Sequence, residues 1–520
     1  MERSRSAEAG GREERSSARS SHRLGVVDIG SNTARFVVFE TSPAGAVRAT
    51  YEDKEVPRLG GGTGPDGQLS DEAIRRGTVA VKRFAKLVRA LDVPRTLAVA
   101  TSAVRDAPNG GDFVRSVERS TGVLLRILSG AEEARYGYLG VASAWELEHD
   151  IVLDMGGGSL QLAEVRRGEL RTTVSLPLGA LRLSERFLEH DPPKKREMDE
   201  LRDHVREALD PVFETFGDRA HRLFGIGGTV RSLARAAIEF RSWPIGRVHG
   251  YPLWDYDIEA LGELLWEMPA DKRRAVPGIG SDRADVVLAG VVVFQELLRA
   301  AKSDHIIVSG TGIREGIALE AVGAKLPAPA VTLAERSVVA ASESFSFRLD
   351  HGRAVTSTAL DLFEVLADRF KWGKSEELAL RVAGWMHDSG IAIDLWRHAH
   401  HSAYLIQNYP LMGLDQREIL LASMAAYVHE GGPLPSEWKK RFQPITTGED
   451  LDTARRLGAI LEIAELTEPF HPRFSSSGDG RMVTVSFSSS SSTAPPGRVG
   501  EKVAKTIPRA FDIEVKIRDS

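Results

Sequence analysis

Two acidic, glycine-rich segments of the sequence have the residue types needed to hold a phosphate group. Asp28-Ile29-Gly30-Ser31-Asn32-Thr33 ends one apolar run, and Asp154-Met155-Gly156-Gly157-Gly158-Ser159 ends another. Small residues expose backbone N–H groups to phosphate oxygens, hydroxyls add donors, and a carboxylate can bind Mg²⁺. A single turn of this kind also serves ordinary hairpins. Two of them predict a phosphate-binding cleft, with Asp154 as the first candidate ligand of Mg²⁺ and Asp28 as the second.

Strands and helices must position these turns. Apolar runs that end in a turn or lead into a helix predict strands starting near residues 24, 35, 96, 123, 150, 223 and 305. The segment from Asp150 repeats the opening pattern of strand, acid, glycine-rich turn and strand, which indicates an internal duplication. Strands alternate with helical segments, so the sequence predicts an α/β class.

Further candidate residues lie beside these turns, and each also has an ordinary structural interpretation. Glu132 and Glu133 begin a helix, where acids interact favourably with the helix dipole. Arg105 follows a buried run and is suited either to a salt bridge or to a bidentate phosphate contact. Thr229 and Arg314 lie in two later glycine-rich turns, where capping and packing are the alternatives to phosphate binding.

Composition sets further limits. The chain has 520 residues, 42% of them hydrophobic, and no cysteine. Disulfides, thiolate-bound zinc and a thiol nucleophile are therefore excluded, which suits the cytoplasm. The net charge of −5 does not attract a polyanion, so such a substrate requires local clusters of arginine and lysine. No segment has the pattern of a signal peptide or a transmembrane span.

Composition shifts along the chain predict five regions. They are a disordered leader at 1–22, one lobe at 23–140, a second lobe at 141–324, an all-α domain at 334–470, and a small α+β domain at 475–520. The Pro- and Ala-rich segment 325–333 is the predicted linker before the helical domain, and a Ser-rich loop interrupts the last domain.

Seven blocks, in this order, resemble the exopolyphosphatase and guanosine pentaphosphate phosphatase (Ppx/GppA) family: DIGSNTARFVVF, ATSAVRDAPNG, ILSGAEEARYGYLGV, LDMGGGSLQLAEV, SLPLGALRLSERF, GIGGTVRSLA and SGTGIREG. The resemblance covers residues 24–322 and, more loosely, the region to about 470. It implies two actin-like (ribonuclease H-like) lobes followed by an HD-like helical domain. It also implies hydrolysis of the terminal phosphoanhydride of inorganic polyphosphate or guanosine pentaphosphate with Mg²⁺, a place in the stringent response, and a homodimer without a nucleic-acid or membrane partner.

The resemblance also implies roles for individual residues. Glu133 aligns with the catalytic glutamate that orients and deprotonates the attacking water. Gln161 departs from the family pattern, because the family has a glutamate there, and this places the strength of metal binding or catalysis in question. The phosphate-binding residues would be Gly30, Ser31, Asn32, Arg105, Gly156, Gly157, Gly158, Ser159 and Thr229.

In the helical domain, His351, His387 and Asp388 resemble the ligands of HD-type metal phosphohydrolases. The expected closing aspartate is replaced by Glu465 or Glu468, and His398 and His401 match a histidine cluster of the family. Helical histidines are often only packed or partly exposed, so a site without metal is the stronger interpretation here.

Three alternatives stay open at this point. No residue separates polyphosphate from guanosine pentaphosphate as the substrate. An actin-like kinase would need an adenosine pocket and a phosphoryl acceptor. A non-catalytic sensor that binds polyphosphate or an alarmone is compatible with Gln161.

Overall fold

The computed structural model describes residues 23–41, 47–62, 66–217, 222–478, 480–487 and 497–519. The chain forms two compact units, Met1–Ala328 and Pro329–Ser520, which divide within the predicted linker. The predicted leader at 1–22 and most of the Ser-rich loop lie outside the described residues.

The first lobe is a five-stranded mixed sheet with the order β3-β2-β1-β4-β5. Strands β1 to β3 are antiparallel, whereas β4 and β5 run parallel to β1. The predicted hairpin is therefore present as β1 and β2. The strands are β1 (Arg23–Ile29), β2 (Ala34–Thr41), β3 (Val47–Glu55), β4 (Arg95–Ala100) and β5 (Leu125–Ile127), and the helices on one face are α2 (Asp71–Ala90), α3 (Ser102–Asp106) and α4 (Gly110–Thr121).

The second lobe repeats this order as β8-β7-β6-β9-β11, with β10 added at the edge. Its first three strands are again antiparallel, and β9 and β11 continue parallel to β6. The strands are β6 (His149–Met155), β7 (Leu160–Arg166), β8 (Glu169–Leu176), β9 (Arg222–Ile226), β10 (Pro252–Trp254) and β11 (His305–Val308). The shared order confirms the predicted duplication of a ribonuclease H-like, actin-type lobe.

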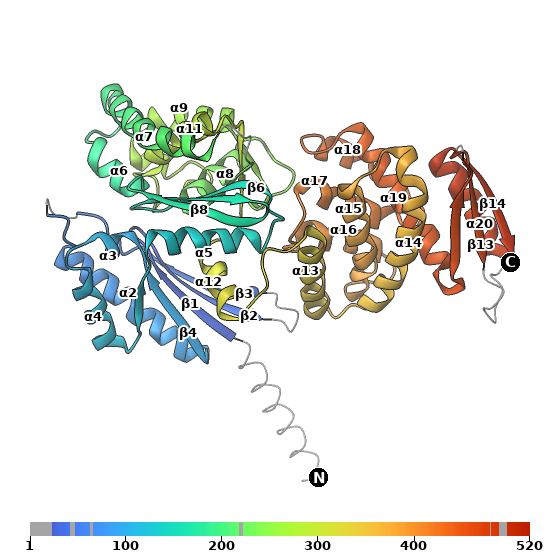
Figure 1. Cartoon of the computed structure of the whole chain (residues 1–520), viewed down its shortest axis with the longest axis horizontal. Helices are drawn as coiled ribbons and strands as arrows, with labels where there is room; N and C mark the ends of the chain where they lie inside the picture. Colours follow the sequence, from blue (N-terminus) through green and yellow to red (C-terminus); the bar gives the residue numbers. More distant parts are fainter. Residues whose placement is uncertain are drawn as a thin grey trace, which may run out of the picture. The chain divides into compact units, whose positions relative to one another are not determined.

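Helices cover both faces of the second sheet. In Figure 1, α7, α9 and α11 lie on one side of β6 and β8, and α5 lies on the other. The core between the sheet and these helices is almost wholly aliphatic, with Phe294 and Tyr251 fully buried in it. The helices of this lobe are α6 (Ala180–Phe187), α7 (Lys195–Phe216), α8 (Gly228–Phe240), α9 (Asp255–Trp266), α10 (Ala270–Arg273) and α11 (Val287–Ala301).

Two helices are exchanged between the lobes. Helix α5 (Gly130–Ala142) follows the first sheet but packs on β6, β7 and β8, whereas α12 (Ile313–Ala321) follows the second sheet but packs on β1 and β3. The two helices also cross closely, because a Cβ at Gly140 would lie 2.1 Å from the carbonyl oxygen of Gly312, and one at Gly316 would lie 2.0 Å from that of Tyr136. Chain order places α5 in the predicted lobe 23–140, but its packing places it against the other lobe.

The second unit is helical and ends in a small sheet, as the sequence predicts. Helices α14, α15, α17 and α19 pack against one another. Strands β12, β13 and β14 form a three-stranded sheet beside α20. The elements are α13 (Ala330–Phe345), α14 (Leu349–Phe370), α15 (Lys374–Met386), η1 (Ser389–Ala392), α16 (His398–Asn408), α17 (Gln416–Val428), α18 (Ser436–Phe442), α19 (Gly448–Thr467), η2 (Glu468–Phe470), β12 (Pro472–Ser476), β13 (Met482–Phe487), α20 (Gly497–Phe511) and β14 (Glu514–Asp519).

Within the described ranges, no helix combines the length and the apolar character that a membrane crossing requires.

Candidate active site

The two predicted phosphate turns have the same local structure. The amide of Gly30 donates to the carbonyl of Thr33 at 2.9 Å, and the amide of Gly156 donates to that of Ser159 at 3.0 Å. Each turn joins two antiparallel strands, β1 to β2 and β6 to β7. Each therefore presents an aspartate at the end of the first strand, Asp28 in one lobe and Asp154 in the other.

The turns meet where the lobes face each other. A Cβ on Gly157 would lie 3.1 Å from both the backbone nitrogen of Asn32 and the Cβ of Ser31. A Cβ on Gly158 would lie 2.6 Å from the hydroxyl oxygens of Ser31 and Ser102. The second turn therefore needs glycine because the first lobe approaches it so closely.

A cavity of about 110 Å³ lies between the turns. Three acidic side chains line it, Asp28, Asp154 and Glu133. The predicted residues on its wall also include Gly30, Ser31, Asn32, Gly156, Gly157, Gln161 and Arg314. Gly158, Ser159, Arg105 and Thr229 are not on this wall. Ser159, Arg105 and Thr229 each contact a side chain that is on it, namely Gln161, Glu133 and Arg283.

The N-terminus of α5 gives its two glutamates different environments. Ser129 caps the helix, and the Glu132 carboxylate accepts from the amide and the hydroxyl of Ser129 at 2.9 Å each. Glu132 thus completes a capping box and faces solvent. Glu133, one position on, is only 4% exposed and faces the cavity.

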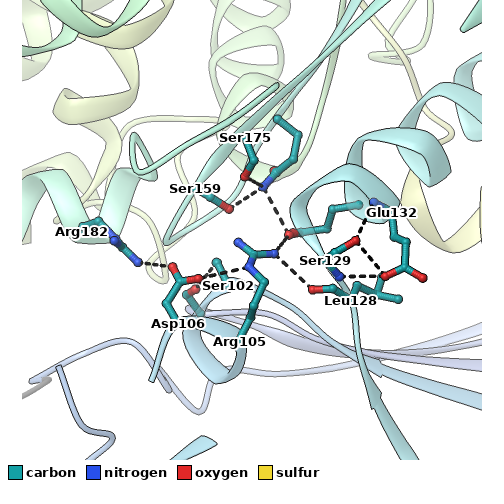
Figure 2. Close-up of polar contacts among 12 residues, drawn as sticks. Ser102, Arg105, Asp106, Leu128, Ser129, Glu132, Ser159, Ser175 and Arg182 are labelled. Carbon is teal, nitrogen blue, oxygen red and sulfur yellow. Dashed lines mark hydrogen bonds and ion pairs between the residues drawn. The ribbon is translucent and has the colours of Figure 1, made fainter. Parts of the chain in front are cut away.

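Glu133 is held by two side chains. The guanidinium of Arg105 forms an ion pair with its carboxylate, and the Gln161 amide nitrogen donates to the same oxygen at 3.2 Å. Figure 2 shows Arg105 between Asp106, at 3.1 Å, and the carbonyl oxygen of Leu128, at 3.3 Å. In this structure the guanidinium of Arg105 contacts the candidate base, and phosphate binding by Arg105 stays a prediction.

Burial changes the acidity of the three carboxyl groups. Loss of solvent raises the pKa of Glu133 to about 8 although Arg105 opposes the shift, and it raises the pKa of Asp154 to about 6. Burial also raises the pKa of Asp28. Buried carboxyl groups around one cavity need a compensating positive charge to ionise. Oxygen donors of this kind fit Mg²⁺, with Asp154 and Asp28 as the residues that would hold it.

Four arginines supply positive charge around the same cavity: Arg35, Arg231, Arg283 and Arg314. Burial lowers the pKa of Arg231 and Arg283 to about 10, so both remain charged at neutral pH. Arg314 was a candidate from the sequence, whereas Arg35, Arg231 and Arg283 were missed. Arg35 on β2 lies opposite Asp28 on β1 in the strand register. The alternation of side chains along β2 could have indicated that Arg35 lies on the same face of the sheet as Asp28.

Thr229 is fully buried and accepts a hydrogen bond from Arg283 at 3.4 Å. Its contact is with a cavity arginine and not with the cavity. Arg283 itself lies in an irregular segment between α10 and α11, next to Asp282. Asp282 pairs with Lys54 of the first lobe at 2.6 Å, and its backbone carbonyl accepts from Asn32 at 3.0 Å. These contacts between the lobes hold the segment that carries Arg283.

A second hollow of about 320 Å³ adjoins the first. It shares the four arginines named above and adds Lys54 and Arg235, together with the acids Glu52, Asp282 and Glu315. Positive charge therefore continues beyond the cavity that holds Glu133. A linear polyanion could follow this path.

Gln161 occupies the place in the second lobe that Arg35 occupies in the first, because Asp154 pairs with Gln161 as Asp28 pairs with Arg35. Its amide nitrogen lies 2.6 Å from the hydroxyl of Ser159 and 3.3 Å from that of Ser175. With its third contact, to Glu133, the amide links the second phosphate turn to the candidate base.

The helical unit contains a separate cluster of metal-ligating side chains. His351, His387 and Glu465 form one group, and Asp388, His398 and His429 form another. Of the alternatives in the sequence, Glu465 and not Glu468 lies in a group, and His401 lies in neither. His429 was missed, since a histidine before the Gly-Gly pair at 431 and 432 resembles a surface turn.

A cleft lined by paired aspartate turns and four arginines, between two duplicated ribonuclease H-like lobes, defines a phosphate-handling protein of the actin-like type. Residues 37–325 match the model of the Ppx/GppA phosphatase family, and residues 333–464 match the model of Ppx/GppA phosphatase, domain III. The chain belongs to the Ppx/GppA phosphatase family.

Several proteins are similar to somewhat more than half of this chain. Exopolyphosphatase 1 of Mycobacterium leprae is 31% identical over 303 residues, which cover 57% of this chain and 88% of that protein. The crystal structure of the Aquifex aeolicus family member is 30% identical with a TM-score of 0.50 and covers 58% of this chain and 97% of that one. An exopolyphosphatase structure from Cytophaga hutchinsonii is 25% identical with a TM-score of 0.55 and covers 58% and 99%.

Proposed function

We propose that this protein removes the terminal phosphate from inorganic polyphosphate, guanosine pentaphosphate or both, with Glu133 as the general base. The observation that carries the proposal is the buried Glu133 carboxylate on the wall of the cavity between the two phosphate turns. A general base must lie near the water that it activates, and its pKa must be close to the pH at which the enzyme operates. Glu133 has a pKa raised by burial to about 8, and it lies on the wall of the cavity in which the attacking water would be placed.

In the proposed reaction, the oxygen of a water molecule attacks the terminal phosphorus while Glu133 accepts a proton from that water. The bond between this phosphorus and the bridging oxygen breaks, and the bridging oxygen leaves on the shortened substrate. Arg105 and Gln161 hold the Glu133 carboxylate in place through the contacts described above. They act as positioning residues.

Charge on the transferred phosphoryl group must be neutralised in the transition state. Arg231, Arg283 and Arg314 line the cavity and supply fixed positive charge there. Mg²⁺, which Asp154 and Asp28 would hold, supplies a Lewis acid for phosphate oxygens when it is bound. The glycine-rich turns supply backbone donors to the same oxygens.

The shape of the charged surface supports an extended substrate. The cavity of about 110 Å³ is small, and the basic hollow beside it extends the path by about 320 Å³. The relatives named exopolyphosphatase agree with this substrate class. Guanosine pentaphosphate carries the same terminal phosphoanhydride and remains in the proposal.

Release of inorganic phosphate from long-chain polyphosphate and from guanosine pentaphosphate, with ATP as the control, tests the proposal. We expect release from at least one of the first two at a rate well above that from ATP. Binding of both without release would identify a sensor. ATP consumption that requires an added phosphoryl acceptor would identify a kinase.

A further inference from the structure

One ion pair between the lobes stands inside the basic hollow beside the cavity. Nζ of Lys54, near the end of β3, lies 2.6 Å from a carboxylate oxygen of Asp282, which belongs to the irregular segment between α10 and α11 of the other lobe. Both side chains line the hollow of about 320 Å³, and neither lines the cavity of about 110 Å³ that contains Glu133. This pair therefore bridges the hollow from one lobe to the other.

The other acids described on the wall of the hollow have partners within their own part of the fold. Glu52 forms an ion pair with Arg35, which belongs to the same sheet. Glu315 accepts from the amide of Gly312 at 2.7 Å and so caps the start of its own helix, α12. Asp282 is thus the acid through which the wall of this hollow ties one lobe to the other.

Asp282 is charged at neutral pH, and its ion pair is open to solvent. Burial opposes its ionisation, but the hydrogen bond from Lys54 and the charge of Arg283 outweigh burial and hold the pKa of Asp282 below its ordinary value. The side chains of Lys54 and Asp282 are 33% and 15% exposed. Ion pairs that solvent reaches contribute little to stability, because water screens them. A polyanion in the hollow can therefore compete with Asp282 for Lys54.

The neighbouring ion pair between the lobes lies outside the hollow. Arg58 pairs with Asp285, which follows Asp282 in the same irregular segment, and neither partner lines the hollow or the cavity. Asn32 of the first phosphate turn also donates to the backbone carbonyl of Asp282 at 3.0 Å. These two contacts hold the segment without the help of Lys54. The side chain of Asp282 can therefore change its partner while its backbone stays in place.

We propose that the Lys54–Asp282 ion pair is a gate across the basic hollow, which a phosphate chain opens as it enters. A short phosphate fills the cavity beside Glu133 and leaves the pair closed. A longer chain extends into the hollow, where its phosphates repel the Asp282 carboxylate and bind the Lys54 ammonium. Asp282 thereby opposes long chains and Lys54 favours them, so the pair sets the chain-length preference. This inference rests on the proposed function of the cleft and names the residues that select among its substrates.

The ratio of kcat/KM for long-chain polyphosphate to kcat/KM for tripolyphosphate tests the gate. Asp282→Asn removes the repelling charge, so this ratio should rise by about threefold or more. Lys54→Gln breaks the same pair but removes a phosphate contact, so the ratio should fall by about the same factor. A pair with only a structural role would not move the ratio in opposite directions, because either substitution breaks it equally.

Asp285→Asn is the matched control, because it breaks the neighbouring pair between the same lobes but outside the hollow. It should leave the ratio within about twofold of the wild-type value. Three results would each overturn the gate. They are an unchanged ratio for Asp282→Asn, a shift in the same direction for Asp282→Asn and Lys54→Gln, and a shift for Asp285→Asn as large as that for Asp282→Asn.

Binding of long-chain polyphosphate by the Glu133→Gln chain separates the gate from the catalytic proposal, because binding requires no hydrolysis. In this background, Asp282→Asn should lower Kd by about threefold or more. Lys54→Gln should raise Kd and weaken its salt dependence by about one released counterion. Unchanged Kd values for both substitutions would refute the gate even if the wild type is active. A wild type that releases no phosphate although these shifts in Kd are present would refute the catalytic proposal and leave the gate standing.

Discussion

Glu132 and Glu133 are neighbours in sequence, but their contacts assign them to different tasks. Glu132 closes the capping box on Ser129, whereas Glu133 is buried beside Arg105 and Gln161. Glu133→Gln should lower kcat by about a hundredfold or more with little change in KM, because the amide keeps the shape but does not accept the proton. Steady-state kinetics on a short polyphosphate measures this.

Glu132→Gln is the matched control for this substitution. It weakens a surface cap and should leave kcat within a few-fold of the wild type. Similar kinetics for the two variants would exclude Glu133 as the base.

The raised pKa of Glu133 gives the activity a definite pH dependence. A base works in its ionised form, and burial holds the pKa of this carboxyl at about 8. Below that pH the fraction of ionised Glu133 falls, so kcat/KM should fall by about tenfold per pH unit on the acid side and level off above the pKa. A pH series at saturating Mg²⁺ measures it. A flat profile between neutral pH and pH 9 would contradict the assignment.

The family resemblance implies a glutamate at the position of Gln161, and the contacts of Gln161 give this difference a physical meaning. A glutamate there would add a negative oxygen beside Asp154, whereas the amide nitrogen now donates to Glu133. Gln161→Glu should therefore lower the Mg²⁺ concentration for half-maximal activity, because a hard cation prefers anionic oxygen ligands. A Mg²⁺ titration of both proteins measures the shift. Superimposable curves would place the ion away from this position and from Asp154.

Sequence patterns predicted the two acidic turns, and the family resemblance pointed to Glu133 as the base, but three of the four cavity arginines were missed. Asp28 and Asp154 each lie near the end of an apolar strand. Because the two sheets repeat the same strand order, these positions are equivalent in the two lobes. Arg283 lies in an irregular segment where no periodicity applies, and its place depends on contacts between the lobes made by Asp282. His429 was missed for the same reason, because only the packing of α17 and α19 shows that it faces Glu465.

At the scale of elements, the crossing of α5 and α12 sets the position of the proposed base relative to the cavity arginine on the other helix. Glu133 lies on α5 and Arg314 on α12. Backbone atoms meet at the crossing, where a Cβ on Gly316 would lie 2.0 Å from the carbonyl oxygen of Tyr136. No side chain can move aside to relieve such a contact, so the helices must separate when the methyl group is added.

Gly316→Ala should therefore impair catalysis although alanine favours helices by about 1 kcal/mol over glycine. We expect kcat to fall by about tenfold to a hundredfold, since a displacement of 1 Å is enough for such a loss. Gly246→Ala is the control, because nothing lies within 4 Å of a Cβ at that position. Phosphate-release kinetics and melting temperatures of both variants measure the effect. A fully active and stable Gly316→Ala protein would contradict the tight crossing.

The element pattern itself could be predicted in large part from sequence, whereas the exchange of helices could not. Alternating apolar runs and turn residues indicated the strands, and the repeated acid and glycine signal indicated the duplication. Chain order alone assigns α5 to the first lobe. Its packing on β6, β7 and β8 depends on contacts between segments far apart in sequence, which local periodicity does not encode.

At the scale of the whole molecule, the two-lobed unit and the helical unit can be tested separately. Several relatives correspond to the two lobes over nearly their whole length, so a chain ending at residue 328 should fold. It should keep kcat on short phosphates but bind long polyphosphate less tightly and with a weaker dependence on salt, because basic contacts outside the cleft are lost. Binding measured at several salt concentrations gives both values. Unchanged affinity and salt dependence would show that the helical unit does not contact the substrate.

The exchange of α5 and α12 also constrains the order in which the two lobes can fold while the chain is being synthesised. One face of the first sheet is completed only when Ile317 and Ala318 of α12 pack with Leu24, Val26 and Phe39. The ribosome makes those residues almost three hundred positions apart, so a nascent first lobe emerges with an uncovered apolar face. Domains usually fold as they are made, from the N-terminus onward. Here the apolar face of the first lobe stays uncovered until α12 of the second lobe has been made.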